Sequence, residues 1–444
     1  MNSMNTYYRM SLLLIHIVIG FIFYNFSYLS TYFGIFIILS GTYLILSKTS
    51  YNKMVPLYLS GYIVGSEVLF RMCKSSLFWE FGKYSIIYFI ILGFIRNGSK
   101  LNLNLPILLY FILLLPSIIN IPLDSFSFWR QSISFNLSGP ACLAFVTCYI
   151  YNIYISKEGL IDILFYSMLP IVSMSIIIFI RMPDIDSYKF LPYSNPVTSG
   201  GYGPNQVSTI FGFMILGLSF AQFNKKYISG YKAIDLFFIL VFIGLGLITF
   251  SRGGLFASII SISIAYSYYF FYDQNKIQMF FKIIFVIIIS SIAWFAIVSI
   301  TEGSISKRYA LSEGGSGEKL YLDLTGRAEI YKLDVEIFYK YFFNGAGPGQ
   351  ANKLRFLLGY GQSNVAAHTE FSRMLAEHGV LGLISLLILA GIPVSNIILS
   401  SCSYNAKVIK ILFGTMAILT MFHSAMRISM PCFIYGFSVI NLKE

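Results

Sequence analysis

Long apolar runs alternate with short polar connections along most of the chain, and one long polar segment, Thr301 to Gly379, interrupts them. Several runs approach the roughly 20 residues that a helix needs to cross a bilayer. The pattern therefore predicts an all-α, polytopic helical membrane protein with about 12–14 transmembrane helices. Fourteen apolar runs can be drawn, at about residues 10–24, 30–47, 54–71, 83–95, 105–121, 137–155, 160–180, 205–223, 234–250, 253–271, 280–300, 380–400, 408–422 and 427–441.

The same pattern divides the chain into three parts. Residues 1–300 hold the first eleven predicted spans, residues 301–379 form a large loop, and residues 380–444 hold the C-terminal spans. Loops of this length without a core of their own are uncommon, and they are usually functional or disordered. We therefore expect the loop to carry at least part of the chemistry.

Basic residues in the short connections predict the orientation. With the N-terminus in the cytoplasm, strict alternation places a lysine in nearly every inner connection, for example Lys48, Lys157, Lys226, Lys407 and Lys443. Lys and Arg concentrate in the cytoplasmic loops of membrane proteins. Both termini are therefore predicted to be cytoplasmic, and the loop 301–379 is predicted to lie outside.

Composition agrees with a membrane protein. Hydrophobic residues make up 57% of the chain and charged residues 11%, whereas a soluble domain carries about 25% charged residues. The net charge of +12 then reflects orientation in the bilayer rather than a nucleic-acid partner. The cysteines show no CxxC spacing, so we expect packing residues rather than disulfides or metal ligands; they are Cys73, Cys142, Cys148, Cys402 and Cys432.

The loop itself contains helical patterns. From Ala328 onward, an apolar stripe predicts an amphipathic helix with Thr325 as its N-cap. The stripe consists of Ile330, Leu333, Ile337, Phe338, Tyr341 and Phe342. Asn344-Gly345 ends this helix, and the glycine-rich stretch 345–349 predicts a tight turn rather than a nucleotide loop. A second short helix is predicted from Thr369 to Glu377, with Thr369 as the cap and Gly379 as the stop.

Arginine is frequent in the segments predicted to lie outside, against the usual charge rule. Its planar fork of donors suits phosphate, so an outward-facing cluster points to an anionic ligand. The alternative for each of them is an interfacial anchor that reaches toward water; Arg252 in particular precedes two glycines and also fits a simple hairpin turn. The arginines concerned are Arg130, Arg181, Arg252, Arg308, Arg327, Arg355, Arg373 and Arg427.

His368 is the sharpest candidate for acid–base chemistry. It stands just before a predicted helix start, where the positive helix end favours the neutral imidazole and free backbone N–H groups can meet a phosphate. A neutral imidazole can accept a proton from a hydroxyl. The alternative is a structural histidine bonded to the loop backbone. Neither HExxH, CxxC nor GxSxG spacing occurs, so we expect no metal site and no cofactor.

Several short motifs follow one another along the chain. They are 135–140 (FNLSGP), 203–206 (GPNQ), 251–254 (SRGG), 325–327 (TGR), 345–349 (GAGPG), 368–371 (HTEF) and 375–379 (LAEHG). In this order they resemble the O-antigen polymerase and O-antigen ligase superfamily of bacterial envelopes. The resemblance spans roughly residues 130–400, and because each motif is short, it lies in the ordered set and the topology.

This resemblance implies a metal-independent, inverting glycosyltransferase at the periplasmic face of the bacterial inner membrane. The substrate class is an oligosaccharide carried on undecaprenyl pyrophosphate, and a chain-length regulator protein is a candidate partner besides the bilayer. The family pattern assigns catalysis to His368, Arg252 and Arg327. The substrate-binding candidates in the remaining motifs and outer segments are Arg130, Arg181, Asn205, Glu370, Arg373 and Arg427.

Four functions stay open, with polymerase favoured. A polymerase moves the growing chain onto another lipid-linked repeat unit, whereas a ligase moves it onto lipid A-core or protein. Ligases of the family often carry His-Asn where this chain has His368-Thr369, which favours the polymerase. A lipid-linked oligosaccharide flippase would need charges inside the spans and internal symmetry, and a non-catalytic assembly partner would not depend on His368.

Overall fold

The computed structural model describes residues 5–47, 52–97, 102, 104–123, 125–184, 194, 196–272, 284, 291, 294–295, 297–301, 303, 306, 327–359, 367, 369–399 and 402–443. These residues are almost entirely helical, which confirms the all-α prediction. In chain order the helices are α1 (Thr6–Asn25), α2 (Leu29–Leu46), α3 (Val55–Met72), α4 (Phe81–Asn97), α5 (Leu105–Ile112), η1 (Pro116–Asn120), α6 (Phe126–Tyr151), α7 (Lys157–Arg181), η2 (Val197–Ser199), α8 (Pro204–Phe223), α9 (Lys232–Ile248), α10 (Arg252–Tyr272), α13 (Arg327–Lys340), α14 (Ala351–Leu357), α15 (Glu370–Ile398), α16 (Tyr404–Met421), α17 (Ser429–Tyr435) and η3 (Gly436–Val439).

Within the described ranges, seven helices are long and apolar enough to cross a membrane. They are α1, α2, α6, α7, α8 (counted with η2), α10 and α15. Every predicted span falls on a helix except 280–300, most of which lies outside the described residues. A multi-pass membrane protein is therefore confirmed, while the count of 12–14 spans stays a prediction.

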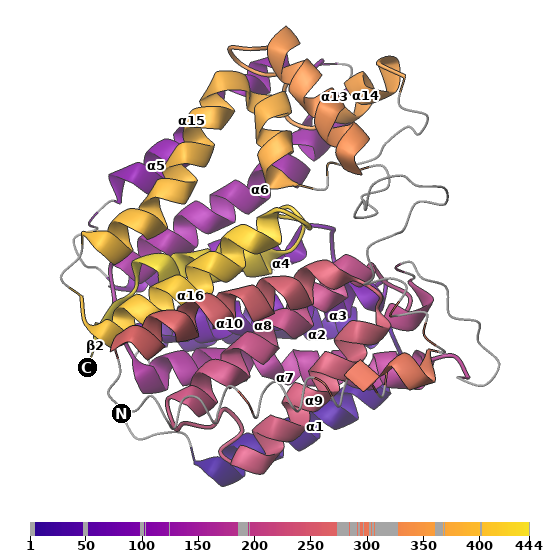
Figure 1. Ribbon diagram of the computed structural model, residues 1–444, viewed down its shortest axis with the longest axis vertical. Helices are drawn as coiled ribbons and strands as arrows, with labels where there is room; N and C mark the ends of the chain where they lie inside the picture. The colour runs from indigo at the N-terminus through magenta and orange to yellow at the C-terminus, as the bar shows by residue number, and fades with distance from the viewer. Residues whose placement is uncertain are drawn as a thin grey trace.

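The helices form one bundle with an extension at one end. Helix α7 packs against α1 and α3, and α10 packs against α8 and α16. Figure 1 shows α5, α6 and α15 rising from this bundle toward α13 and α14 at the top of the view. Both chain ends lie at the left of the same view. Which side of a membrane the extension with α13 and α14 faces stays a prediction.

A short parallel strand pair, absent from the prediction, closes the end of the bundle near the chain ends. Strand β1 (Tyr154–Ser156) pairs with β2 (Asn441–Lys443), with Ile155 opposite Leu442. Because β1 lies between α6 and α7, the pairing fixes the last described residues of the chain to an early connection.

Over the described part of residues 327–379, three helices are present where the sequence predicted two. Ile330 and Ile337 of the predicted stripe are buried on α13, whereas Phe342, beyond the end of this helix, is exposed. Helix α14 was missed because it has only seven residues and no periodic apolar pattern. A buried ion pair between Arg355 of α14 and Asp334 of α13 holds it in place.

The predicted glycine turn is present and packs directly on α15. Ala346 N–H donates to the Ala376 carbonyl at 2.9 Å, and Gly347 N–H donates to the Glu377 carbonyl at 3.0 Å. Gly345 has φ +69°, and a Cβ there would lie 2.3 Å from the Glu377 carbonyl oxygen. Only glycine fits so close an approach in this backbone conformation.

Thr369 caps α15 as predicted, with its hydroxyl oxygen accepting from Ser372 N–H at 3.1 Å. Gly379 ends the first segment of this helix: its φ of 59° and ψ of −141° are non-helical, and a second segment continues from Val380 to Ile398. The predicted stop is therefore a kink between a short polar helix and a membrane span. The predicted cap Thr325 lies outside the described residues.

Candidate functional site

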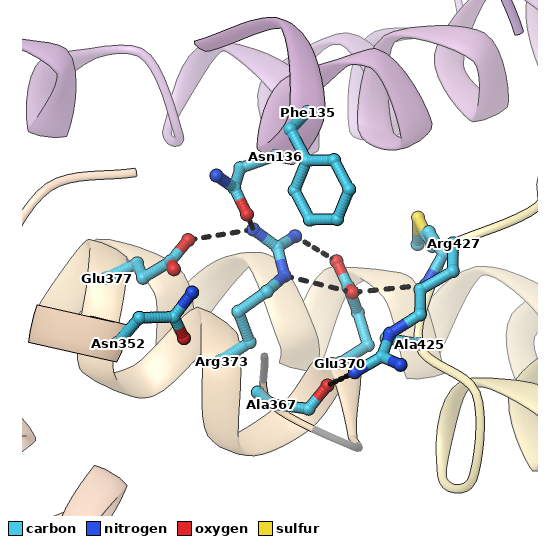
Figure 2. Close-up of a pocket in the computed structure, with 10 residues that line it drawn as sticks. Phe135, Asn136, Asn352, Ala367, Glu370, Arg373, Glu377, Ala425 and Arg427 are labelled. Carbon is cyan, nitrogen blue, oxygen red and sulfur yellow. Dashed lines mark hydrogen bonds and ion pairs between the residues drawn. The ribbon is translucent and has the colours of Figure 1, made fainter. Parts of the chain in front are cut away.

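Four segments that are far apart in the sequence line one small polar cavity (Figure 2). They are α6, α14, the start of α15 with Ala367 before it, and the connection between α16 and α17 (residues 422–428, the α16–α17 connection). The cavity volume is about 30 Å³, enough for about one water molecule. Its lining residues are Phe135, Asn136, Asn352, Ala367, Glu370, Arg373, Glu377, Ala425, Met426 and Arg427.

Arg373 stands at the centre of this cavity between two carboxylates. It forms ion pairs with Glu370 and Glu377, and its Nη1 donates to Glu377 Oε2 at 2.9 Å. The three residues share one helix face because they are spaced three and four residues apart. All three side chains are buried. Since most donors of Arg373 point at these carboxylates, a phosphate here would have to compete with both of them.

Arg427 ties the α16–α17 connection to the segment that contains His368. Its Nη2 donates to the Ala367 carbonyl at 2.7 Å. Met426 N–H donates to Glu370 Oε2 at 3.3 Å. His368 itself lies outside the described residues, but its neighbours Ala367 and Thr369 are each held by a hydrogen bond.

The 203–206 and 251–254 motifs meet beside the same connection. Ser251 Oγ donates to Asn205 Oδ1 at 2.8 Å, and Ser208 Oγ donates to the Ser251 carbonyl at 2.9 Å. A Cβ on Gly253 would lie 2.3 Å from the His423 ring, so this glycine allows the imidazole to pack on the first turn of α10. Arg252, half-exposed, begins that helix.

Arg71 links the 203–206 motif to the α16–α17 connection. It was not among the predicted site residues. Its Nη1 donates both to Gln206 Oε1 and to the Arg427 carbonyl, each at 3.0 Å. The sequence does contain a signal for Arg71, because ionisable residues inside an apolar run are costly to bury and are often functional. Glu67 and Arg71 both fall within the run 54–71.

The remaining predicted residues lie in different surroundings. Arg181, at the end of α7, donates to the Met72 and Gly200 carbonyls at 3.2 and 2.9 Å. Arg130 is exposed on the second turn of α6. Arg327 begins α13, and its side chain lies outside the described residues. The structure thus brings Glu370, Arg373 and Arg427 into one cavity, and the ligand role of every predicted residue stays a prediction.

Charge is also buried under the large loop. Burial raises the pKa of the Asp334 carboxyl, and the guanidinium of Arg355 opposes this shift. Over the described part of the chain, no group of three or more His, Cys, Asp or Glu side chains could hold a metal ion. The polar groups that the structure offers to a ligand here are therefore arginines, carboxylates and amides.

Fold and site together define a multi-pass helical membrane protein with a polar, arginine-rich site at one end of its bundle. Residues 236–387, which are 152 of the 444 residues, match the family described as O-antigen ligase. This match includes Arg252, Arg327, His368, Glu370 and Arg373, and it confirms the resemblance to the O-antigen polymerase and ligase superfamily. Residues 236–387 are thus similar to the O-antigen ligase family, in a chain whose described helices are those of a multi-pass membrane protein. No curated protein sequence is significantly similar to the chain.

Proposed function

We propose that the protein is an O-antigen polymerase. It transfers a glycan from undecaprenyl pyrophosphate onto another lipid-linked repeat unit at the periplasmic face of the inner membrane. One observation carries this proposal: the 203–206, 251–254 and 367–373 segments meet around the α16–α17 connection, through hydrogen bonds that join residues far apart in the sequence. Two of these three segments lie inside the O-antigen ligase match.

The proposed reaction is a single displacement at the anomeric carbon of the donor sugar. The bond from that carbon to the pyrophosphate oxygen breaks, and a bond to the acceptor hydroxyl oxygen forms on the opposite face, so the configuration inverts. His368 takes the hydroxyl proton as general base. Arg252 and Arg327 stabilise the charge that develops on the departing pyrophosphate, and this electrostatic role lets the reaction run without a metal.

The position of the charged groups favours an enzyme over a flippase. Arg71 lies at the end of α3, Lys83 in the first turn of α4, and Arg373 in the first turn of α15. A flippase would need such charges deep within its spans, along the path of the sugar. The His368-Thr369 pair favours polymerase over ligase, because the ligases of this superfamily often carry His-Asn.

The proposal is tested by the lipopolysaccharide of a strain that lacks the gene, separated on a gel. A polymerase deletion leaves core plus one repeat unit, and the wild-type gene restores the ladder. Core alone, with lipid-linked polymer accumulating, would instead indicate the ligase. An unchanged ladder would exclude both.

Complementation with His368→Ala separates catalysis from a passive assembly role. We expect no ladder with this variant at wild-type protein abundance. The matched control is His16→Gln, because His16 is buried in α1 and bonded to the Tyr62 hydroxyl at 2.8 Å, away from the site. A full ladder with His368→Ala would overturn the catalytic assignment.

A further inference from the structure

Helix α3 carries a buried ion pair that the proposed mechanism does not use. Glu67 and Arg71 are 3% and 4% exposed, and their side chains meet at 2.7 Å across one helical turn. Burying two charges is costly unless further hydrogen bonds compensate for the lost hydration. The other hydrogen-bond partners of Glu67 and Arg71 therefore indicate the role of this ion pair.

Arg71 uses its guanidinium to join segments that the fold brings in from three other places. Nη1 donates to the Gln206 side chain and to the Arg427 carbonyl, both at 3.0 Å. Nη2 donates to the Trp79 carbonyl at 3.1 Å, and the guanidinium carbon lies 4.8 Å from the Trp79 ring centre. This planar fork is particular to arginine, since a lysine ammonium cannot reach four such acceptors together.

Glu67 holds the first residue of α17, two residues after Arg427. Its Oε2 accepts from both the N–H and the hydroxyl of Ser429, at 2.6 and 2.7 Å. One ion pair therefore clamps the backbone on both sides of Ile428. Arg427 lies within this clamp, with its side chain directed at the Ala367 carbonyl.

We propose that Glu67 and Arg71 are positioning residues for glycosyl transfer, acting through the α16–α17 connection on Arg427 and the segment next to His368. The inference rests on the proposed function for its effect on rate. Its structural part, the clamp on residues 427–429, stands independently of the reaction. In this proposal the pair contacts no substrate itself; it sets the positions of Arg427 and of the backbone next to His368.

The first test measures the initial rate of polymer formation by purified Arg71→Lys and Glu67→Gln proteins. We expect a loss of about 10-fold or more, because misplacing a site by about 1 Å can cost roughly 100-fold. The loss should fall on kcat rather than on the KM for the lipid-linked substrate. The double variant Arg71→Lys/Arg427→Lys should be less than about twofold slower than Arg427→Lys alone. The two losses should not multiply, because Arg71 is proposed to act through Arg427.

Arg9 provides a matched control at a distance from the site. It is buried, pairs with Asp162, donates to the Ile228 carbonyl at 2.6 Å and lies over the Phe165 ring. Arg9→Lys removes the same kind of interaction, but its effect should multiply with that of Arg427→Lys. Independent, multiplying losses for Arg71→Lys would overturn the positioning role.

Hydrogen–deuterium exchange tests the clamp without any activity. In Arg71→Lys and Glu67→Gln, the amides of 367–373 and 427–429 should exchange at least about 10-fold faster than in the wild type. Exchange in α7 should be unchanged, and Arg9→Lys should leave residues 367–373 and 427–429 protected. Unchanged exchange at 427–429 in a folded variant would refute the inference, whereas a wild-type protein without polymerase activity would refute only the proposed function.

Discussion

Gly379 lies at the kink between the large loop and the membrane-spanning segment of α15. We expect the substitution Gly379→Ala to disrupt the packing at this kink. Its backbone has φ 59° and ψ −141°, a region that residues with a Cβ rarely occupy. A Cβ there would lie 2.4 Å from the Phe342 carbonyl oxygen and 2.6 Å from the Gly345 nitrogen. Both contacts are to backbone, so no side chain can turn away to relieve them.

The size of the effect follows from three contributions. A residue with a Cβ in this conformation costs about 1–3 kcal/mol, and overpacking adds about 1–3 kcal/mol. Relieving the clash would also disturb the hydrogen bond from Val380 N–H to the Phe342 carbonyl, now 2.7 Å long, worth about 1 kcal/mol. We expect Gly379→Ala to lower the free energy of unfolding by about 3–7 kcal/mol.

Thermal unfolding of the detergent-solubilised protein measures this loss. The matched control is Gly391→Ala in the same helix, where an added Cβ meets nothing within 4 Å. Alanine is favoured over glycine inside a helix by about 0.5–1 kcal/mol, so this control should keep or raise the unfolding temperature. If Gly379→Ala unfolded at the temperature of Gly391→Ala, the argument from the kink would be refuted.

Three further outcomes are expected from the same structure. Arg355→Ala should destabilise the protein by about 3–5 kcal/mol because it leaves the Asp334 carboxylate buried and without its ion pair. Burial already raises the pKa of Asp334 and Arg355 opposes this, so without Arg355 the carboxyl should protonate more readily and the loss should shrink as pH falls from 8 to 5. An equal loss at both pH values would contradict the buried charge. Thr369→Ala should lower the free energy of unfolding by about 1 kcal/mol through loss of the helix cap, whereas Thr369→Ser should retain the cap. Equal unfolding temperatures for the two variants would rule out the cap. All five cysteines should react as free thiols in the unreduced, denatured protein, as the structure has no disulfide among them; a count below five would contradict this.

Local features of the fold could be predicted from the sequence because local chemistry decides them. Apolar runs marked the helices, Thr369 marked a cap, and Gly379 marked a break. Helix α14 could not be predicted, because its stability depends on an ion pair between residues 21 positions apart, Asp334 and Arg355. No periodic pattern within seven residues carries that information.

Within the site, contacts between residues that are far apart in the sequence were also not predictable. The spacing of Glu370, Arg373 and Glu377 is readable as one helix face, so their ion pairs could have been predicted. Arg71, in contrast, bonds to groups 135 and 356 positions away, in Gln206 and Arg427. Only the packing of the helices reveals that these residues belong to one site.

Reconstitution of the purified protein in liposomes tests the central claim most directly. The only glycan supplied would be a single repeat unit on undecaprenyl pyrophosphate, with no lipid A-core. We predict a ladder of lipid-linked polymer with matching release of undecaprenyl pyrophosphate, and loss of both with Arg252→Lys. Unchanged repeat units, and glycan transfer only after lipid A-core is added, would contradict the polymerase assignment and favour the ligase.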